Sequence, residues 1–191
     1  MRRERKEVGG AEKVPPDMKP ESRMEELRGL ADALIERAKG AGLGIVTAES
    51  CTAGLMCQVL ADAEGASTFF HGGFVTYTKL HKSHALGVPD TLLREKGAVC
   101  AEVARAMAEG ALKQSKAGIA AAITGVAGPE PDEDGNPVGR VCLAVARHGF
   151  PTCDFERHYD PNICRDAIRR HAVADALRAM TEALASVSAA A

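Results

Sequence analysis

The sequence predicts an α/β fold, a layered domain in which a mixed, largely parallel sheet is flanked by helices. Segments with helical spacing of apolar residues alternate with short buried runs early in the chain, which is typical of parallel strands joined by helices. Two strand-like segments joined by a turn follow late, which adds an antiparallel pair. Aromatic residues make up only 4% of the chain and Trp is absent, so aliphatic side chains must form the core.

The first half of the chain divides into two helices and two strands. Apolar residues at helical spacing predict a helix over 24–38 that ends at Gly40 or Gly42. A short buried strand is expected at 44–48, followed by a helix that starts near Ser50. Gly65 and Ser67 are expected in a loop, and 74–77 in a second strand.

The second half is expected to contain further helices and a late hairpin. Short helices are predicted at 79–86 and 90–96, a longer one at 101–112, and a buried strand at 117–124. Strands at 138–147 and 153–159 flank a turn at 149–151. Asp160 is a plausible N-cap for a last helix that runs to about Val187. The inward face of that helix is predicted to carry Ile168, Ala172, Leu177, Met180 and Leu184.

Composition limits the classes of protein to consider. The 191 residues allow a disordered N-terminal tail at 1–22 and one domain at 23–191. A net charge of -2, without a basic stripe, argues against nucleic-acid binding, and the apolar runs are too short to cross a membrane. The six cysteines form no CxxC pair, and no signal peptide opens the chain, so reduced thiols in a cytoplasmic protein are expected.

The first segment that could carry chemistry is 47–54, with the sequence TAESCTAG. A strand runs into a turn there, and Ser50 is expected at the N-terminus of the next helix, where unpaired N–H groups favour an anion or an oxyanion. Ser50 is therefore a candidate nucleophile. The alternative is that Ser50 only caps the helix, as serine commonly does.

Two more segments follow expected strands. In residues 71–82 a strand ends in Tyr77 and two lysines, Lys79 and Lys82, follow in the next helix turn, and a partly dry lysine can act as general base to a serine. Alternatively, both lysines are exposed charges.

The glycines of 122–129 allow close approach of the backbone to a ligand, or form a plain turn. The acidic run 130–134 does not match a calcium loop and is expected to be a solvated turn.

Together these segments resemble the CinA C-terminal domain family, the nicotinamide-nucleotide amidohydrolases. The resemblance is carried by TAESCTAGL at 47–55, GASTFFHGGFVTYTKLHKSHALGV at 65–88, GAVCAEVARAMAEGA at 97–111, ITGVAGP at 123–129 and NPVGRV at 136–141. The chain departs from the family pattern at Thr78-Lys79, where many relatives have Ser-Asn. It also has the acidic run 130–134 where many have a glycine-rich loop.

The resemblance implies hydrolysis of nicotinamide mononucleotide to nicotinic acid mononucleotide and ammonia, without a metal or cofactor. It implies a serine nucleophile, here Ser50, and matches the family's tyrosine and lysine to Tyr77 and Lys82. The remaining positions that it brings to the site are Glu49, Thr124, Gly125, Arg165 and Arg169.

The expected mechanism is of the Ser–Lys type. Neutral Lys82 takes the proton of Ser50, and N–H groups near Cys51 and Thr52 stabilise the oxyanion. Tyr77 would hold the lysine or relay the proton, and Glu49 would orient the pair of Ser50 and Lys82. Arg165 or Arg169 would bind the substrate phosphate.

Two other functions stay open at this point. The same chemistry could act on a different small amide, or the domain could be a non-enzymatic binding module associated with competence and DNA damage. A homodimer or higher homo-oligomer is expected from alanine-rich helices with few charges on one face.

Overall fold

A computed structural model describes residues 20–185 of the chain, and most of the tail expected at 1–22 lies outside them. Twelve elements follow in order: α1 (Pro20–Ala41), β1 (Ile45–Glu49), α2 (Leu55–Ala61), α3 (Ala66–Phe69), β2 (Phe70–Val75), α4 (Lys79–Leu86), α5 (Asp90–Lys96), α6 (Ala101–Lys113), β3 (Ile119–Gly125), β4 (Arg140–Arg147), β5 (Cys153–His158) and α7 (Arg165–Ala185). The expected end of the last helix near Val187 lies outside the described residues.

The five strands form one sheet in the order β2-β1-β3-β4-β5. β1 pairs in parallel with both β2 and β3, whereas β4 pairs antiparallel with β3 and with β5. Consequently β4 alone among these strands runs against the others. The predicted mixed, largely parallel sheet is therefore confirmed.

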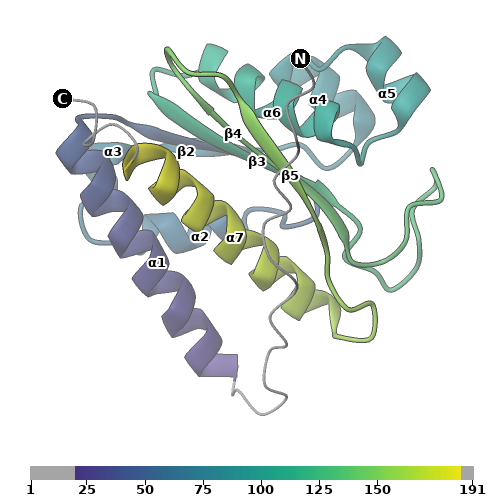
Figure 1. Cartoon of the computed structure of the whole chain (residues 1–191), viewed down its shortest axis with the longest axis horizontal. Coiled ribbons are helices and arrows are strands. Elements are labelled where there is room, and N and C mark those ends of the chain that lie inside the picture. The colour runs from purple at the N-terminus through teal and green to yellow at the C-terminus, as the bar shows by residue number, and fades with distance from the viewer. Residues whose placement is uncertain (1–19, 186–191) are drawn as a thin grey trace, which may run out of the picture.

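Helices cover both faces of this sheet, which gives three layers (Figure 1). On one face, α1 and α7 lie side by side and share a core with α2. On the other face, α4, α5 and α6 pack over a second core. Alternation along β1 divides its side chains between the two faces, so Ile45 belongs to the first core and Val46 and Ala48 to the second. The five residues expected on the inward face of the last helix are all buried in the first core.

Four local expectations are wrong. No helix starts at Ser50, because residues 50–54 form turns and α2 begins only at Leu55. β2 begins at Phe70, before the expected start at Phe74, because its Phe70 pairs with Ile45 of β1. Ser67 lies in the short helix α3 rather than in a loop. Asp160 accepts the N–H of Asn162 in a turn, and α7 starts later, at Arg165.

Three parallel strands end together and place the candidate site. The sheet pairing continues just beyond β1, where the Ser50 N–H donates to the Ile123 carbonyl at 2.9 Å. Beside it, the Thr76 N–H donates to the Glu49 carbonyl at 2.8 Å. Residues that follow β1 and β2 therefore lie next to the end of β3. Carboxyl ends of parallel strands are the usual location of sites in α/β sheets.

Candidate active site

Ser50 and Lys82 are in direct contact. The Lys82 Nζ lies 2.8 Å from the Ser50 Oγ, although the two residues are 32 positions apart in the chain. Lys82 comes from the first turns of α4, where Thr78 caps the helix by accepting the His81 N–H. Ser50 faces it from the turn after β1. Sequence reasoning predicted this pair, and the geometry brings it together.

Burial favours the neutral form of the Lys82 amine. The side chain is 0% exposed and Ser50 is 7% exposed. Removal from water lowers the pKa of Lys82 from 10.5 to about 8, an effect that the nearby Cys51 thiol partly opposes. About one tenth of the amine is therefore neutral at pH 7, and a larger fraction is neutral above it.

Thr76 is a site residue that sequence reasoning missed. Its carbonyl accepts a hydrogen bond from the Lys82 Nζ at 2.9 Å. A neutral amine keeps two N–H donors and one lone pair. With one N–H directed at Thr76, the lone pair can accept the hydroxyl proton of Ser50. Backbone carbonyls carry no sequence signal, so only the end of β2 beside β1 could have indicated this contact.

Glu49 lies on the opposite face of the sheet from Lys82. Its buried carboxylate accepts the N–H groups of Gly54 at 3.0 Å, Met56 at 3.1 Å and Cys57 at 2.8 Å. These are the donors that the start of a helix leaves without partners, so Glu49 caps α2 from the neighbouring strand. The capped donors are not available for an oxyanion.

The turn that carries Ser50 retains other donors. Within residues 20–185, neither the N–H of Cys51 nor that of Thr52 donates to another residue, and the Cys51 N–H lies beside its own thiol. Both donors sit directly after Ser50, in a turn rather than at a helix start. The Cys51 thiol is buried, which raises its pKa to about 11, so it stays neutral beside the hydroxyl.

A cavity of about 600 Å³ opens above this pair. Its lining includes Ser50, Cys51, Tyr77, Lys79, Lys82, Thr124, Gly125, Arg165 and residues 130 and 132–134. Thr124 is buried, and its hydroxyl donates to the Ala98 carbonyl at 2.8 Å. Gly125 admits no Cβ, because such an atom would lie 2.8 Å from the Arg140 carbonyl oxygen. These two positions therefore form a close-packed wall of the cavity.

The other predicted residues contact each other rather than Lys82. Tyr77 is 56% exposed, and its hydroxyl accepts a hydrogen bond from Arg165 at 3.0 Å. Arg165 also donates to the Gly128 carbonyl. Arg169, one turn further along α7, donates to the Thr52 carbonyl at 2.6 Å and lies outside the cavity lining. Thr52 is likewise buried outside the lining.

Comparison with known proteins identifies the family. The model of the CinA C-terminal domain matches residues 27–184. The chain belongs to this family. The nicotinamide-nucleotide amidohydrolase PncC of Escherichia coli is 37% identical over 155 residues, which cover 81% of this chain and 93% of that protein. The resemblance seen in the motifs is thereby confirmed.

Other relatives of this CinA C-terminal domain are longer. A putative competence-damage inducible protein of Symbiobacterium thermophilum is 50% identical over 108 residues, 56% of this chain and 25% of that protein. The chain thus matches about a quarter of the length of such relatives. The crystal structure of competence/damage inducible protein CihA from Agrobacterium tumefaciens has a TM-score of 0.78 and 40% identity, covering 83% of this chain and 95% of that one.

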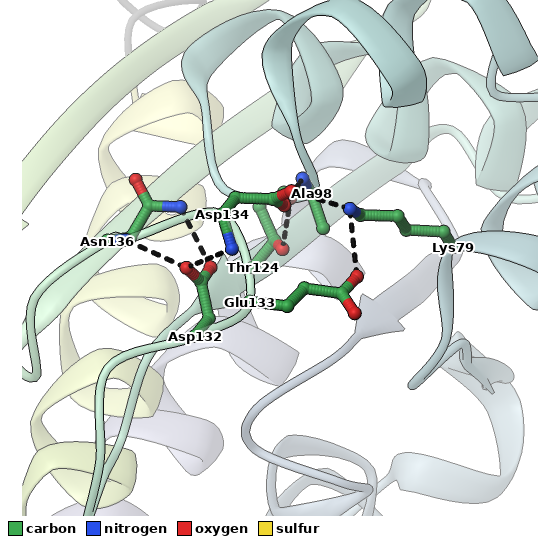
Figure 2. Close-up of polar contacts among 7 residues, drawn as sticks. All are labelled: Lys79, Ala98, Thr124, Asp132, Glu133, Asp134 and Asn136. Atoms are coloured by element: carbon green, nitrogen blue, oxygen red, sulfur yellow. Dashed lines mark hydrogen bonds and ion pairs between the residues drawn. The ribbon is translucent and has the colours of Figure 1, made fainter.

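The acidic run of this CinA domain forms a strap, residues 130–136, beside the cavity (Figure 2). The Asp132 carboxylate accepts the N–H groups of Asp134 at 3.0 Å and Asn136 at 2.8 Å, and it also accepts the Asn136 side-chain amide. The Lys79 Nζ contacts Glu133 at 2.8 Å and Asp134 at 2.7 Å. Lys79 is therefore ion-paired, which raises its pKa and separates it from the role of Lys82.

Neither a membrane span nor a metal cluster is found in the part of the chain that the structure describes. No helix there is long and apolar enough to cross a bilayer. No group of three or more His, Cys, Asp or Glu side chains in that part could hold a metal ion.

Proposed function

We propose that this domain hydrolyses the carboxamide of nicotinamide mononucleotide to give nicotinic acid mononucleotide and ammonia. The observation that carries the proposal is the buried 2.8 Å contact between Lys82 and Ser50 at the base of an open cavity. A serine activated by a desolvated lysine is a known arrangement for acyl transfer. The likeness to PncC over most of the chain supports the choice of amide.

The first half of the reaction forms an acyl-enzyme. The neutral amine of Lys82 takes the Ser50 proton while the Oγ attacks the carboxamide carbon. The N–H of Cys51, which lines the cavity, is the candidate donor to the oxyanion, whereas Thr52 is buried outside the lining; one such donor contributes about 3 kcal/mol in other enzymes. The ammonium of Lys82 then gives its proton to the leaving nitrogen, and ammonia departs.

The second half releases the acid. Lys82, neutral again, takes a proton from water, which attacks the acyl carbon. The returning proton restores the Ser50 hydroxyl, so atoms and protons balance over the cycle. The Thr76 carbonyl holds the amine in place throughout. Arg165, at the exposed end of the cavity with Tyr77, is the proposed partner of the substrate phosphate.

Ammonia release from nicotinamide mononucleotide by the purified protein tests the function. We expect Ser50→Ala to abolish turnover, and Lys82→Ala to lower it at least 100-fold because the serine loses its base. Lys79→Ala is the matched control from the same helix turn and should be affected far less. Ammonia release by Ser50→Ala equal to that of the wild type would exclude Ser50 as the nucleophile.

A different small amide is the second candidate, favoured by the carboxylates along the strap. Glu130, Asp132, Glu133 and Asp134 line the same cavity as Ser50 and give it acidic character. A substrate with an extra positive charge would suit such a wall. Rates measured on nicotinamide, its riboside and its mononucleotide decide between the two, because only the mononucleotide carries phosphate.

A further inference from the structure

Lys79 sits between the catalytic helix turn and the acidic strap. It precedes Lys82 by one turn of α4, yet its Nζ points to the carboxylates of Glu133 and Asp134, at 2.8 Å and 2.7 Å (Figure 2). Lys79, Glu133 and Asp134 are called the mouth clamp below. All three line the cavity that contains Ser50. The clamp therefore places charged groups at the cavity that a substrate must enter to reach Ser50.

One carboxylate of the clamp, that of Asp134, is also held independently of Lys79. The second oxygen of Asp134 accepts the Ala98 N–H at 3.1 Å, and the Ala98 carbonyl is fixed by Thr124 at 2.8 Å. The strap itself is closed by the hydrogen bonds of Asp132 with Asp134 and Asn136. Loss of the Lys79 charge should therefore leave the strap closed, with the Asp134 carboxylate fixed and uncompensated and the charge of Glu133 unpaired beside it.

The charged groups that line the cavity have a net negative charge, and Lys79 reduces it. Four carboxylates, those of Glu130, Asp132, Glu133 and Asp134, face three basic groups, those of Lys79, Lys82 and Arg165. The base of the proposed reaction is the neutral form of Lys82, which leaves Lys79 and Arg165 as the cations. Without Lys79, a phosphate that approaches Arg165 would meet a wall with one more net negative charge.

We propose that Lys79 is a specificity-determining residue that offsets one of the two negative charges of Glu133 and Asp134 and thereby admits a substrate that carries a phosphate. The proposal rests on the proposed function. It assigns Lys79 to substrate capture and not to the chemical step, since the Lys79 Nζ is bound to carboxylates and it is the Lys82 Nζ that contacts the Ser50 hydroxyl.

The expected effect is on KM. In Lys79→Met we expect KM for nicotinamide mononucleotide to rise about 3- to 10-fold while kcat stays within twofold, as unmasked charges at a partly exposed site would produce. Added salt should bring the KM of this variant back toward the wild-type value, because screening weakens repulsion between exposed charges. A merely structural defect would not respond to salt in this way.

A charge-balanced variant separates electrostatics from packing. In Lys79→Met combined with Glu133→Gln, one positive and one negative charge are removed together, so the net charge of the lining stays that of the wild type, and Asp134 still accepts the Ala98 N–H. KM should return to near the wild-type value, and Lys79→Arg alone should keep it. Lys96→Met, which breaks an ion pair with Glu102 outside the cavity lining, is the matched control and should leave KM unchanged.

Binding of nicotinic acid mononucleotide, measured by calorimetry, provides a readout besides activity. Weaker binding by Lys79→Met, with recovery in the charge-balanced variant, supports the role of Lys79. If the wild type binds in this way but releases no ammonia, only the proposed function is overturned. If the wild type is active but Lys79→Met has an unchanged KM, or the charge-balanced variant stays impaired, the role of Lys79 is overturned. A wild type that neither binds nicotinic acid mononucleotide nor releases ammonia from nicotinamide mononucleotide overturns both proposals.

Discussion

At the scale of single residues, Glu49 and Ser50 are neighbours in the chain with opposite surroundings. Alternation along β1 sends Glu49 to the face covered by α2 and Ser50 to the face covered by α4. The sequence motif places a carboxylate next to the nucleophile and predicts that it orients the lysine. Strand periodicity already argues against that contact, because successive residues of a strand point to opposite faces of the sheet. This alternation alone separates the capping role of Glu49 from the catalytic role of Ser50.

Substitutions at Glu49 should therefore act mainly on stability. Glu49→Ala leaves three N–H groups at the start of α2 without an acceptor, one of them buried and two partly buried, and we expect the free energy of unfolding to fall by about 4 kcal/mol. Glu49→Gln keeps one acceptor oxygen and should cost about half as much. Denaturant titration measures both, with the exposed Glu64→Gln as control. A loss below about 1 kcal/mol in Glu49→Ala would show that other groups cap the helix.

The ionisation of Lys82 should govern the pH dependence of activity. Burial lowers its pKa to about 8, and the neutral amine is the proposed base. We therefore expect kcat/KM to rise about tenfold per pH unit below pH 8 and to level off above it. Initial rates of ammonia release between pH 6 and about 9.5 measure this profile. A rate that falls as the pH rises through 8 would mean that charged Lys82 is the active form.

At the scale of elements, local signals predicted the helices best. α4 and α5 coincide with the predicted ranges, since Thr78 caps α4 and Gly87 and Gly97 follow the two helices within the same stretch of sequence. The turn at 50–54 was missed because the cap of α2 comes from Glu49 on a strand, and Gly54 adopts a left-handed conformation before Leu55. The bounds of β2 were missed because pairing with β1 fixes them.

Two arginines of α7, Arg165 and Arg169, each contact a loop of the site, and we expect them to differ in function. Arg169 fixes the Thr52 carbonyl at 2.6 Å and so positions the turn of Ser50, whereas Arg165 lines the cavity. We expect Arg169→Met to lower kcat 10- to 100-fold with little change in KM, as loss of a charge-assisted hydrogen bond predicts. Arg165→Met should instead raise KM.

Steady-state kinetics of both variants tests this division. Arg178→Met serves as control, because it removes a cation of the same helix that pairs with Glu26 at 2.7 Å outside the site. A rise in KM for Arg169→Met without loss of kcat would return that residue to substrate binding, as the sequence resemblance implies.

At the scale of the whole molecule, the three layers enclose a charged side chain that costs folding free energy. Lys82 is among the largest fully buried side chains in the described part of the chain. It lies where α4 meets the ends of β1 and β2, and its hydrogen-bond acceptors there are the Ser50 hydroxyl and the Thr76 carbonyl. The fold class could be predicted from apolar patterns alone, whereas this cost depends on packing between distant segments.

The cost should depend on pH with a definite sign. The pKa of Lys82 is about 8 in the folded protein and near 10.5 in the unfolded chain, so between these values the unfolded state binds more protons and stability rises with pH. Below pH 8 both states are charged and the full penalty remains. Buried thiols have the opposite effect on the pH dependence of stability, because burial raises the pKa of Cys57 and Cys142 to about 12 and the folded state then binds more protons at alkaline pH.

A comparison with Lys82→Met isolates the lysine from the thiols, which both proteins share. We expect the difference in unfolding free energy, wild type minus variant, to increase by about 2 kcal/mol between pH 7 and pH 9.5. Denaturant titrations at the two pH values measure it, and the exposed Lys39→Met controls for loss of one positive charge. Loss of the Thr76 acceptor contact shifts the variant equally at both pH values. If the difference in unfolding free energy is the same at both pH values, Lys82 keeps its ordinary pKa in the folded protein. Lys82 would then be charged at neutral pH and could not act as the proposed base.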